Sequence, residues 1–241
     1  MIAEVMTTQF WLGLMTIIWV NIILSGDNAV VIALAARSLP PHQQKKAIFY
    51  GAGAAVLMRI ALTVVAVKLL QYPYLKLIGA VLLLWIAVKL LVPEEDAGDG
   101  VESSANLVTA IKTILIADLV MSLDNVIGVA AAAKGSMLLL ILGLLISIPL
   151  VVFGATVLMR LMERFPIIIT LGAAILGWVA GEMAVTDPVL AQWVNENASW
   201  LHWVGPAAGA AIVVIVGKAI AGREKSKHKP VVDLAGGEPG A

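Results

Sequence analysis

The chain of 241 residues contains no cysteine, only three histidines and little charge. Without cysteine it has no disulfides and no thiolate metal ligands. The histidines, His42, His202 and His228, fall in predicted loops or in the tail, which argues against a buried zinc, copper or nickel site and against a serine–histidine hydrolase. Charged residues make up 13% of the chain and the formal net charge is zero, so overall charge says nothing about partners. We expect no nucleic-acid partner. The N-terminus has neither a basic region nor a small-residue cleavage site, so the first apolar segment is predicted to be a retained membrane helix.

Apolar sequence, in contrast, is abundant. Hydrophobic residues make up 61% of the chain and the mean hydropathy is +0.97. Helices satisfy their own backbone hydrogen bonds in lipid, and the alternation typical of barrel strands is absent. We therefore predict an all-α polytopic membrane protein, embedded in the lipid bilayer by segments that approach or exceed the roughly 20 residues a spanning helix needs. The seven predicted transmembrane helices are 8–36, 47–70, 74–92, 107–133, 136–158, 166–185 and 203–221.

Lysine and arginine flank these segments unevenly. With the N-terminus outside, only Lys68, Lys76 and Lys134 lie on the outer side, and Arg59 is too deep to assign. The positive-inside rule therefore predicts an outer N-terminus and an inner C-terminus. A compact chain of this kind is typical of a bacterial inner membrane. The cations on the inner side are Arg37, Lys45, Lys46, Lys89, Lys112, Arg160, Arg164, Lys218, Arg223, Lys225, Lys227 and Lys229.

The two halves of the chain resemble each other. Ser25-Gly26-Asp27-Asn28 returns 97 residues later as Ser122-Leu123-Asp124-Asn125, and the segment 79–89 aligns with 172–182. Three helices are an odd number, so the second copy enters the membrane from the opposite side, which gives an inverted repeat of the kind common in secondary transporters. The predicted parts are a first three-helix repeat (1–92), an acidic cytoplasmic linker (93–106), a second three-helix repeat (107–186), an outer loop with a seventh helix (187–221) and a basic flexible tail (222–241).

Acidic and other oxygen-bearing side chains lie at membrane depth. Each acid costs roughly 2.5–3.5 kcal/mol at a helix centre, so such residues usually face the bundle interior and mark a pathway. Oxygen ligands without thiolate or imidazole suit Mg²⁺, Ca²⁺ or Mn²⁺. In each half, three of these residues stand at i, i+4 and i+7, on one face of a helix. The candidate metal ligands are Asn21, Ser25, Asp27 and Asn28 in the first half, and Asp118, Ser122, Asp124, Asn125 and Glu182 in the second.

The depths of the two motifs leave alternatives open. In straight helices Asp27 and Asp124 lie more than about 10 Å apart in depth, too far for one cation. Either the helices are broken, which Gly26 permits and Leu123 does not, or there are two successive sites. The acids also have structural interpretations, as caps or as partners of Arg59, which is either a counter-ion or part of a gate. Glu182 lies near the outer boundary, where simple surface exposure is equally expected.

The paired Ser-X-Asp-Asn motifs, Asp118 before the second, and Gly177-Trp178-Val179-Ala180-Gly181-Glu182 resemble the TerC family of integral membrane proteins, close to its bacterial YjbE-type branch. The resemblance covers residues from about 8 to 221. It implies manganese homeostasis, chiefly efflux of Mn²⁺, and for some relatives a supply of Mn²⁺ to secreted enzymes. It also implies a functional set of Asp27, Asn28, Asp124 and Asn125, followed by Glu182 and Asp118.

These observations predict a secondary transporter that exports a divalent cation, with Mn²⁺ as the first candidate, and no enzymatic activity. No nucleotide-binding motif is visible, so the energy would come from proton exchange or from the ion's own gradient. Neighbouring carboxylates repel each other when charged, so a proton can replace the metal on the return step. Mn²⁺ is expected as cargo, with no resident cofactor. The alternatives are a non-transporting scaffold or metal-delivery subunit and, less favoured because its sequence motifs are absent, an intramembrane aspartyl protease.

Overall fold

The computed structural model describes residues 7–69, 72–92, 102–133 and 136–227, and these form helices joined by short turns. No strand occurs in these four ranges, in agreement with the predicted all-α class. Long stretches of alanine and branched aliphatic residues, interrupted by few prolines, account for the helices. The helices are α2 (Thr8–Leu24), α3 (Gly26–Arg37), α4 (Pro41–Leu69), α5 (Leu75–Leu91), α6 (Glu102–Ala133), α7 (Met137–Arg164), α8 (Ile167–Val185), α9 (Pro188–Asn197) and α10 (Leu201–Lys227).

Five of these helices are long and apolar enough to cross a membrane, and the pair α2 and α3 counts as a sixth span if taken together. The remaining predicted span, 74–92, is α5, with 17 residues. At 1.5 Å per residue α5 is about 25 Å long, shorter than the roughly 30 Å hydrocarbon core. The structure thus supports five to six spans, while the count of seven, the inverted repeat and the orientation stay predictions.

The first apolar segment is bent. Helices α2 and α3 meet at Ser25 with a bend of 52°, and the backbone of Ser25 leaves the helical region at φ −113° and ψ 7°. The sequence allowed a break here on account of Gly26, which begins α3. A Cβ at Gly26 would meet no atom within 4 Å, so the bend does not depend on a missing side chain at this position.

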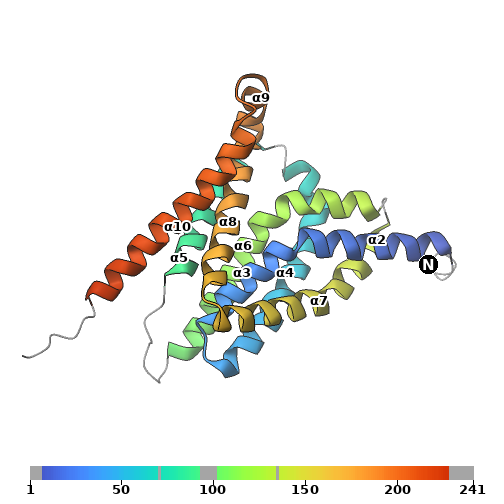
Figure 1. The fold of residues 1–241 in the computed structure, drawn as a ribbon. Helices are drawn as coiled ribbons and strands as arrows, with labels where there is room; N and C mark the ends of the chain where they lie inside the picture. The colour runs from blue at the N-terminus through green and yellow to red at the C-terminus, as the bar shows by residue number, and fades with distance from the viewer. Residues whose placement is uncertain (1–6, 70–71, 93–101, 134–135, 228–241) are drawn as a thin grey trace, which may run out of the picture.

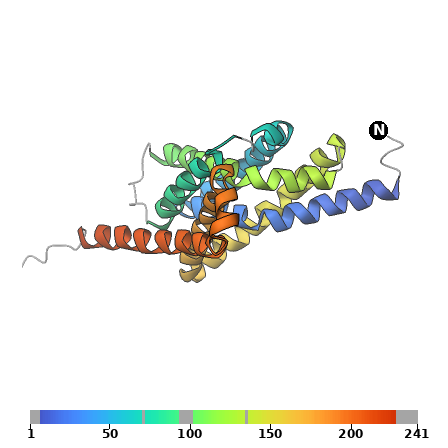
Figure 2. The same cartoon turned by 90° about the horizontal axis from the view of Figure 1, so that it is seen from above.

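The helices form two groups with α3 between them. Helices α2, α4, α6 and α7 contact one another, and α5, α8 and α10 form a second group. Every residue of α3 from Asn28 to Ala36 is buried, and α3 contacts α4, α6, α7 and α8. The start of α2 and the end of α10 lie at opposite ends of the molecule in both views (Figures 1 and 2). The bend at Ser25 therefore leads the chain from the periphery into the core.

Glycines allow α8 and α10 to pack closely. A Cβ on Gly181 would collide with the carbonyl oxygen of Gly205, and one on Gly209 would collide with that of Gly177. Small residues at this spacing let membrane helices approach backbone to backbone. This contact attaches the last helix to the second group.

Asp187 connects α9 to the start of α5 at one end of this group. It is fully buried and its carboxylate accepts hydrogen bonds from the backbone N–H groups of Tyr74 at 3.2 Å, Leu77 at 3.1 Å and Val189 at 2.9 Å. It thereby caps α9 and holds the start of α5. The segment 187–202, predicted to be a loop, thus contains a helix that the sequence analysis missed, although aspartate followed by Pro188 is a typical helix start.

Two predicted segment boundaries differ from the helix ends. The linker 93–106 ends earlier, since α6 already begins at Glu102, and the tail predicted to be flexible from residue 222 continues α10 to Lys227. Both stretches consist of residues compatible with helix and lack glycine and proline between the new and the old boundary, apart from Gly222. Residues 93–101 and 228–241 lie outside the described part of the chain.

Candidate functional site

A cluster of buried polar side chains lies where α2, α4 and α6 meet, and the guanidinium of Arg59 is at its centre. Arg59 comes from α4 and is 3% exposed. On α6 its Nε donates to Ser122 Oγ at 3.0 Å and its Nη2 to Asp118 Oδ1 at 2.8 Å. At the end of α2 its Nη1 donates to Asn21 Oδ1 and Ser25 Oγ, both at 2.8 Å. Arg59 therefore connects the two segments that carry the Ser-X-Asp-Asn motifs.

Asp118 is held by this cluster on both oxygens. Its Oδ1 forms an ion pair with Arg59 at 2.8 Å, and its Oδ2 accepts a hydrogen bond from Ser122 Oγ at 3.1 Å. Buried charges require such partners because an isolated charge is expensive to remove from water. Of the two interpretations of Arg59, the counter-ion is the one observed. Asp118 as a metal ligand stays a prediction, and it requires Arg59 to move.

Ser147 of α7 closes the cluster on its far side. Asn21 Nδ2 donates to Ser147 Oγ, and Ser147 in turn donates to the carbonyl oxygen of Leu144 at 2.6 Å. Ser147 is fully buried, and the sequence analysis did not select it. The sequence signal that could have identified Ser147 is a hydroxyl side chain in the middle of an apolar helix, two residues before Pro149.

The break between α2 and α3 is stabilised by residues of both motifs. In a continuous helix the carbonyl oxygen of Leu24 would accept from the N–H of Asn28. Here Leu24 accepts from Asn125 Nδ2 at 2.8 Å, and the N–H of Asn28 donates to Asp27 Oδ1 at 2.8 Å. The second motif thus supplies the partner for the carbonyl that the break exposes, and the first motif supplies the partner for the amide.

The helix ends at the break also shape the local field. A helix C-terminus carries partial negative charge and an N-terminus partial positive charge. The C-terminal end of α2 therefore favours a cation beside Ser25. At the start of α3 the half-buried carboxylate of Asp27 offsets the positive end, and it interacts electrostatically with Arg59 and Asp118. Half-helix ends of this kind bind cations in other membrane proteins.

Asn28 differs from the other members of the cluster. It is 3% exposed, yet neither polar atom of its side chain has a hydrogen-bond partner. It lines a cavity of about 10 Å³ together with Asn21, Ser25, Arg59 and Asp118. Such a volume holds about one water molecule, and buried polar groups without a partner are rare. The cavity and Asn28 together offer an unused oxygen ligand beside the cluster.

Not all predicted ligands gather here. Glu182 is exposed on α8, as the surface interpretation expected. Asp124 belongs to α6, but its side chain lies outside the described part of the structure. Within that part, no three acidic, histidine or cysteine side chains are close enough to hold a metal ion together. In this conformation the cluster binds the guanidinium with the oxygens predicted to bind metal.

A larger cavity of about 510 Å³ lies at the far ends of α2, α6 and α7, lined among others by Gly13, Thr16 and Leu139. An apolar layer separates it from the polar cluster. On α2, Ile17 comes between the cavity and Asn21, and on α7, Leu144 comes between Leu139 and Ser147. The buried residues of this layer are Ile17, Val56, Val129, Ala133, Leu140 and Leu144.

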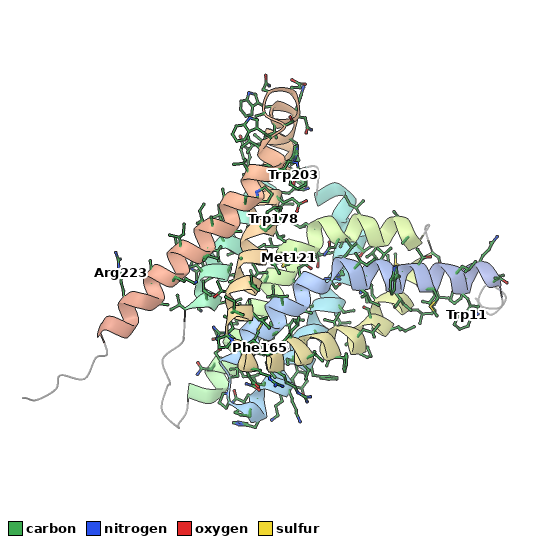
Figure 3. The ribbon with its side chains drawn as sticks, viewed as in Figure 1. Trp11, Met121, Phe165, Trp178, Trp203 and Arg223 are labelled. Atoms are coloured by element: carbon green, nitrogen blue, oxygen red, sulfur yellow. The ribbon has the colours of Figure 1, made fainter. Side chains whose placement is uncertain are left out.

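Figure 3 shows where labelled side chains lie in the bundle. Met121, the residue before Ser122, lies near the middle of the bundle, whereas Trp11 and Trp203 lie at its periphery. Trp11 is 53% exposed and Trp203 is 74% exposed. Many large apolar residues thus face outward, as expected in lipid, while the polar cluster lies within an otherwise apolar core.

Comparison with known proteins relates this chain to integral membrane proteins. The family described as "Integral membrane protein TerC family" matches residues 6–225. Membrane protein YjbE of Bacillus subtilis is 40% identical over 210 residues, 87% of this chain and 95% of YjbE. YceF of the same organism is 27% identical over 191 residues, 75% of this chain and 74% of YceF. Inner membrane protein YoaE of Escherichia coli is 27% identical over 249 residues, 95% of this chain but 46% of YoaE. No solved structure matches.

Proposed function

Because this chain belongs to the TerC family of integral membrane proteins, we propose that it is a secondary transporter that exports a divalent cation, with Mn²⁺ as its cargo. By analogy with the inner membrane relative YoaE, it would act in a bacterial inner membrane. The single observation that carries the proposal is the polar cluster around Arg59, with the unpaired side chain of Asn28 beside it.

The chemistry of the cluster suits a hard or borderline divalent cation. Carboxylate, carboxamide and hydroxyl oxygens are the ligands preferred by Mn²⁺ and Mg²⁺. Asn21, Ser25, Asn28 and Asp118 bring these groups to one small cavity. The C-terminal end of α2 adds negative partial charge. Asn21, Ser25 and Asn28 lie at the broken helix, a position where discontinuous membrane helices typically bind their substrates, and Asp118 faces them from α6.

For the proposed transporter, we interpret the arrangement of the two cavities as a closed conformation. The cavity at the cluster is about 10 Å³, and the apolar layer around Ile17 and Leu144 separates it from the cavity of about 510 Å³. Transport requires this layer to open and close as the substrate passes. No nucleotide-binding motif is present in the sequence, so we assign the energy to the ion gradient or to proton exchange. Asp27, which has no ion-pair partner in the described part of the chain, is the candidate proton carrier.

The test is Mn²⁺ flux into liposomes that contain the purified protein. We expect flux with the wild type and its loss in Asn28→Ala, because this change removes the unpaired ligand. Asn197→Ala is the matched control, since Asn197 is exposed on α9 and bonds only locally to the carbonyl of Trp193. Absence of flux in the wild type would favour the scaffold alternative, and equal flux in Asn28→Ala would refute the assigned site.

A further inference from the structure

We propose that Arg59 is a built-in competitor of the transported cation, which must leave the oxygens of the cluster before the metal can bind them. The inference rests on the proposed transport function and adds to it a residue that sets the affinity of the site. The sequence analysis considered Arg59 only as a counter-ion or as part of a gate.

The hydrogen bonds of Arg59 carry the argument. Its four side-chain hydrogen bonds, at 2.8–3.0 Å, all end on predicted metal ligands. Asn21 belongs to α2 and Ser25 lies at the break that follows it, while Asp118 and Ser122 belong to α6. The guanidinium thus occupies the position between the two motif-bearing segments that a bridging cation requires.

A metal ion and the guanidinium cannot share these oxygens. Each hydrogen bond from Arg59 occupies one lone pair of these oxygens, and the cavity of about 10 Å³ leaves no room for a metal ion beside the guanidinium. Arginine also stays protonated in proteins, so the guanidinium and a divalent cation a few ångströms apart repel each other strongly in a site shielded from water. Metal binding to Asn21, Ser25 or Asp118 therefore requires displacement of Arg59.

Asn28 gives the displacement a starting point. Its side chain is buried beside Arg59, lines the same cavity and has no hydrogen-bond partner. An incoming cation meets this free carboxamide oxygen first and then competes with Arg59 for the remaining ligands. The competition lowers the affinity for every cation. It disfavours monovalent ions most, because a single charge offsets less of the free energy needed to displace Arg59.

The expected consequence is a rise in affinity when the competitor is removed. If the state with Arg59 displaced is about 1–10% populated, its removal tightens the apparent dissociation constant about tenfold to a hundredfold. We would measure Mn²⁺ binding to the purified full chain by electron paramagnetic resonance, which counts free Mn²⁺. The variants are Arg59→Gln, Arg59→Lys and, as a matched control remote from the cluster, Arg37→Gln on α3, where Arg37 donates to the carbonyl of Leu90.

The inference predicts tighter binding in Arg59→Gln, an intermediate value in Arg59→Lys and no change in Arg37→Gln. If Arg59→Gln does not fold, Arg59→Lys decides, because a lysine keeps the charge but cannot make the four bonds at once. In Arg59→Ala, added guanidinium ion should again weaken Mn²⁺ binding, an effect absent from the wild type.

Two results would overturn the inference. Mn²⁺ flux in the wild type, with unchanged or weaker Mn²⁺ binding in Arg59→Gln and Arg59→Lys, would show that Arg59 only holds the ligands in place. The proposed function would then survive. No Mn²⁺ flux in the wild type and no binding by any folded variant would overturn both proposals together.

Discussion

The two Ser-X-Asp-Asn segments have almost the same sequence but differ in structure. The first lies at a break, where α2 ends at Leu24 and α3 begins at Gly26 after a bend of 52°. The second lies within α6, which continues without interruption from Glu102 to Ala133. One motif therefore exposes backbone groups inside the protein, while the other supplies a side chain that pairs with one of them.

The difference shows that equal residues in two motifs have unequal roles. Asn125 is bound to the carbonyl of Leu24 and supports the break, whereas the aligned Asn28 has no partner. Likewise, Asn21 and Asp118 occupy matching positions and both accept from Arg59, but only Asp118 carries a charge. The site therefore has one side on the continuous helix α6 and the other at the break between α2 and α3.

The largest effect is expected at Asp118, the charged member of the cluster on α6. Asp118→Ala leaves Arg59 buried without a counter-ion, which should lower the free energy of unfolding by about 3–5 kcal/mol. Thermal unfolding in detergent measures the loss. Moving the charge to the other segment, in the double variant Asn21→Asp with Asp118→Asn, should restore most of the stability because Arg59 contacts both positions. A double variant no more stable than Asp118→Asn would contradict the equivalence of the two positions.

The next largest effect should separate the two aligned asparagines. Asn125→Ala leaves the carbonyl of Leu24 without a partner and should cost about 1–3 kcal/mol of stability. Asn28→Ala removes an unpaired group, so its stability should equal or exceed that of the wild type. Parallel unfolding curves of the two variants test this contrast, and equal losses in both would remove the distinction drawn between the motifs.

A smaller loss is expected for Asp27→Ala, because Asp27 lies in the first turn of α3, where it accepts from the N–H of Asn28 and offsets the positive helix end. Interactions of this kind at a helix start contribute about 0.5–2 kcal/mol. Asp27→Asn keeps an oxygen acceptor for the N–H of Asn28 and should lose less. If the two variants are equally unstable, the hydrogen bond contributes nothing and only the charge of Asp27 matters.

The smallest effect is expected for Gly26→Ala. The added methyl group meets open space, and such a change alters stability by no more than about 1 kcal/mol where the backbone accepts it. Wild-type stability and Mn²⁺ flux would show that Asn125 and Asp27 maintain the break without glycine. A large loss would instead assign the break to the flexibility of Gly26.

The sequence predicted the elements of this fold well, because apolar length and helix periodicity are local properties. The buried face of Asn21 and Ser25 followed from their spacing, and the possible break followed from Gly26. Contacts between helices were not readable in the same way. Three contacts depend on how distant helices pack: those of Arg59 with both segments, of Ser147 with the cluster, and of Asn125 with Leu24. Periodicity along one helix does not specify this packing.

The position of bound Mn²⁺ tests the central claim most directly, and anomalous scattering from crystals of the metal-loaded protein would locate it. We predict a metal peak within about 2.0–2.6 Å of Asn28 Oδ1, the usual range for hard divalent cations, with Arg59 detached from Asn21 and Asp118. A peak at a surface acid such as Glu182, with the hydrogen bonds of Arg59 unchanged, would contradict the account.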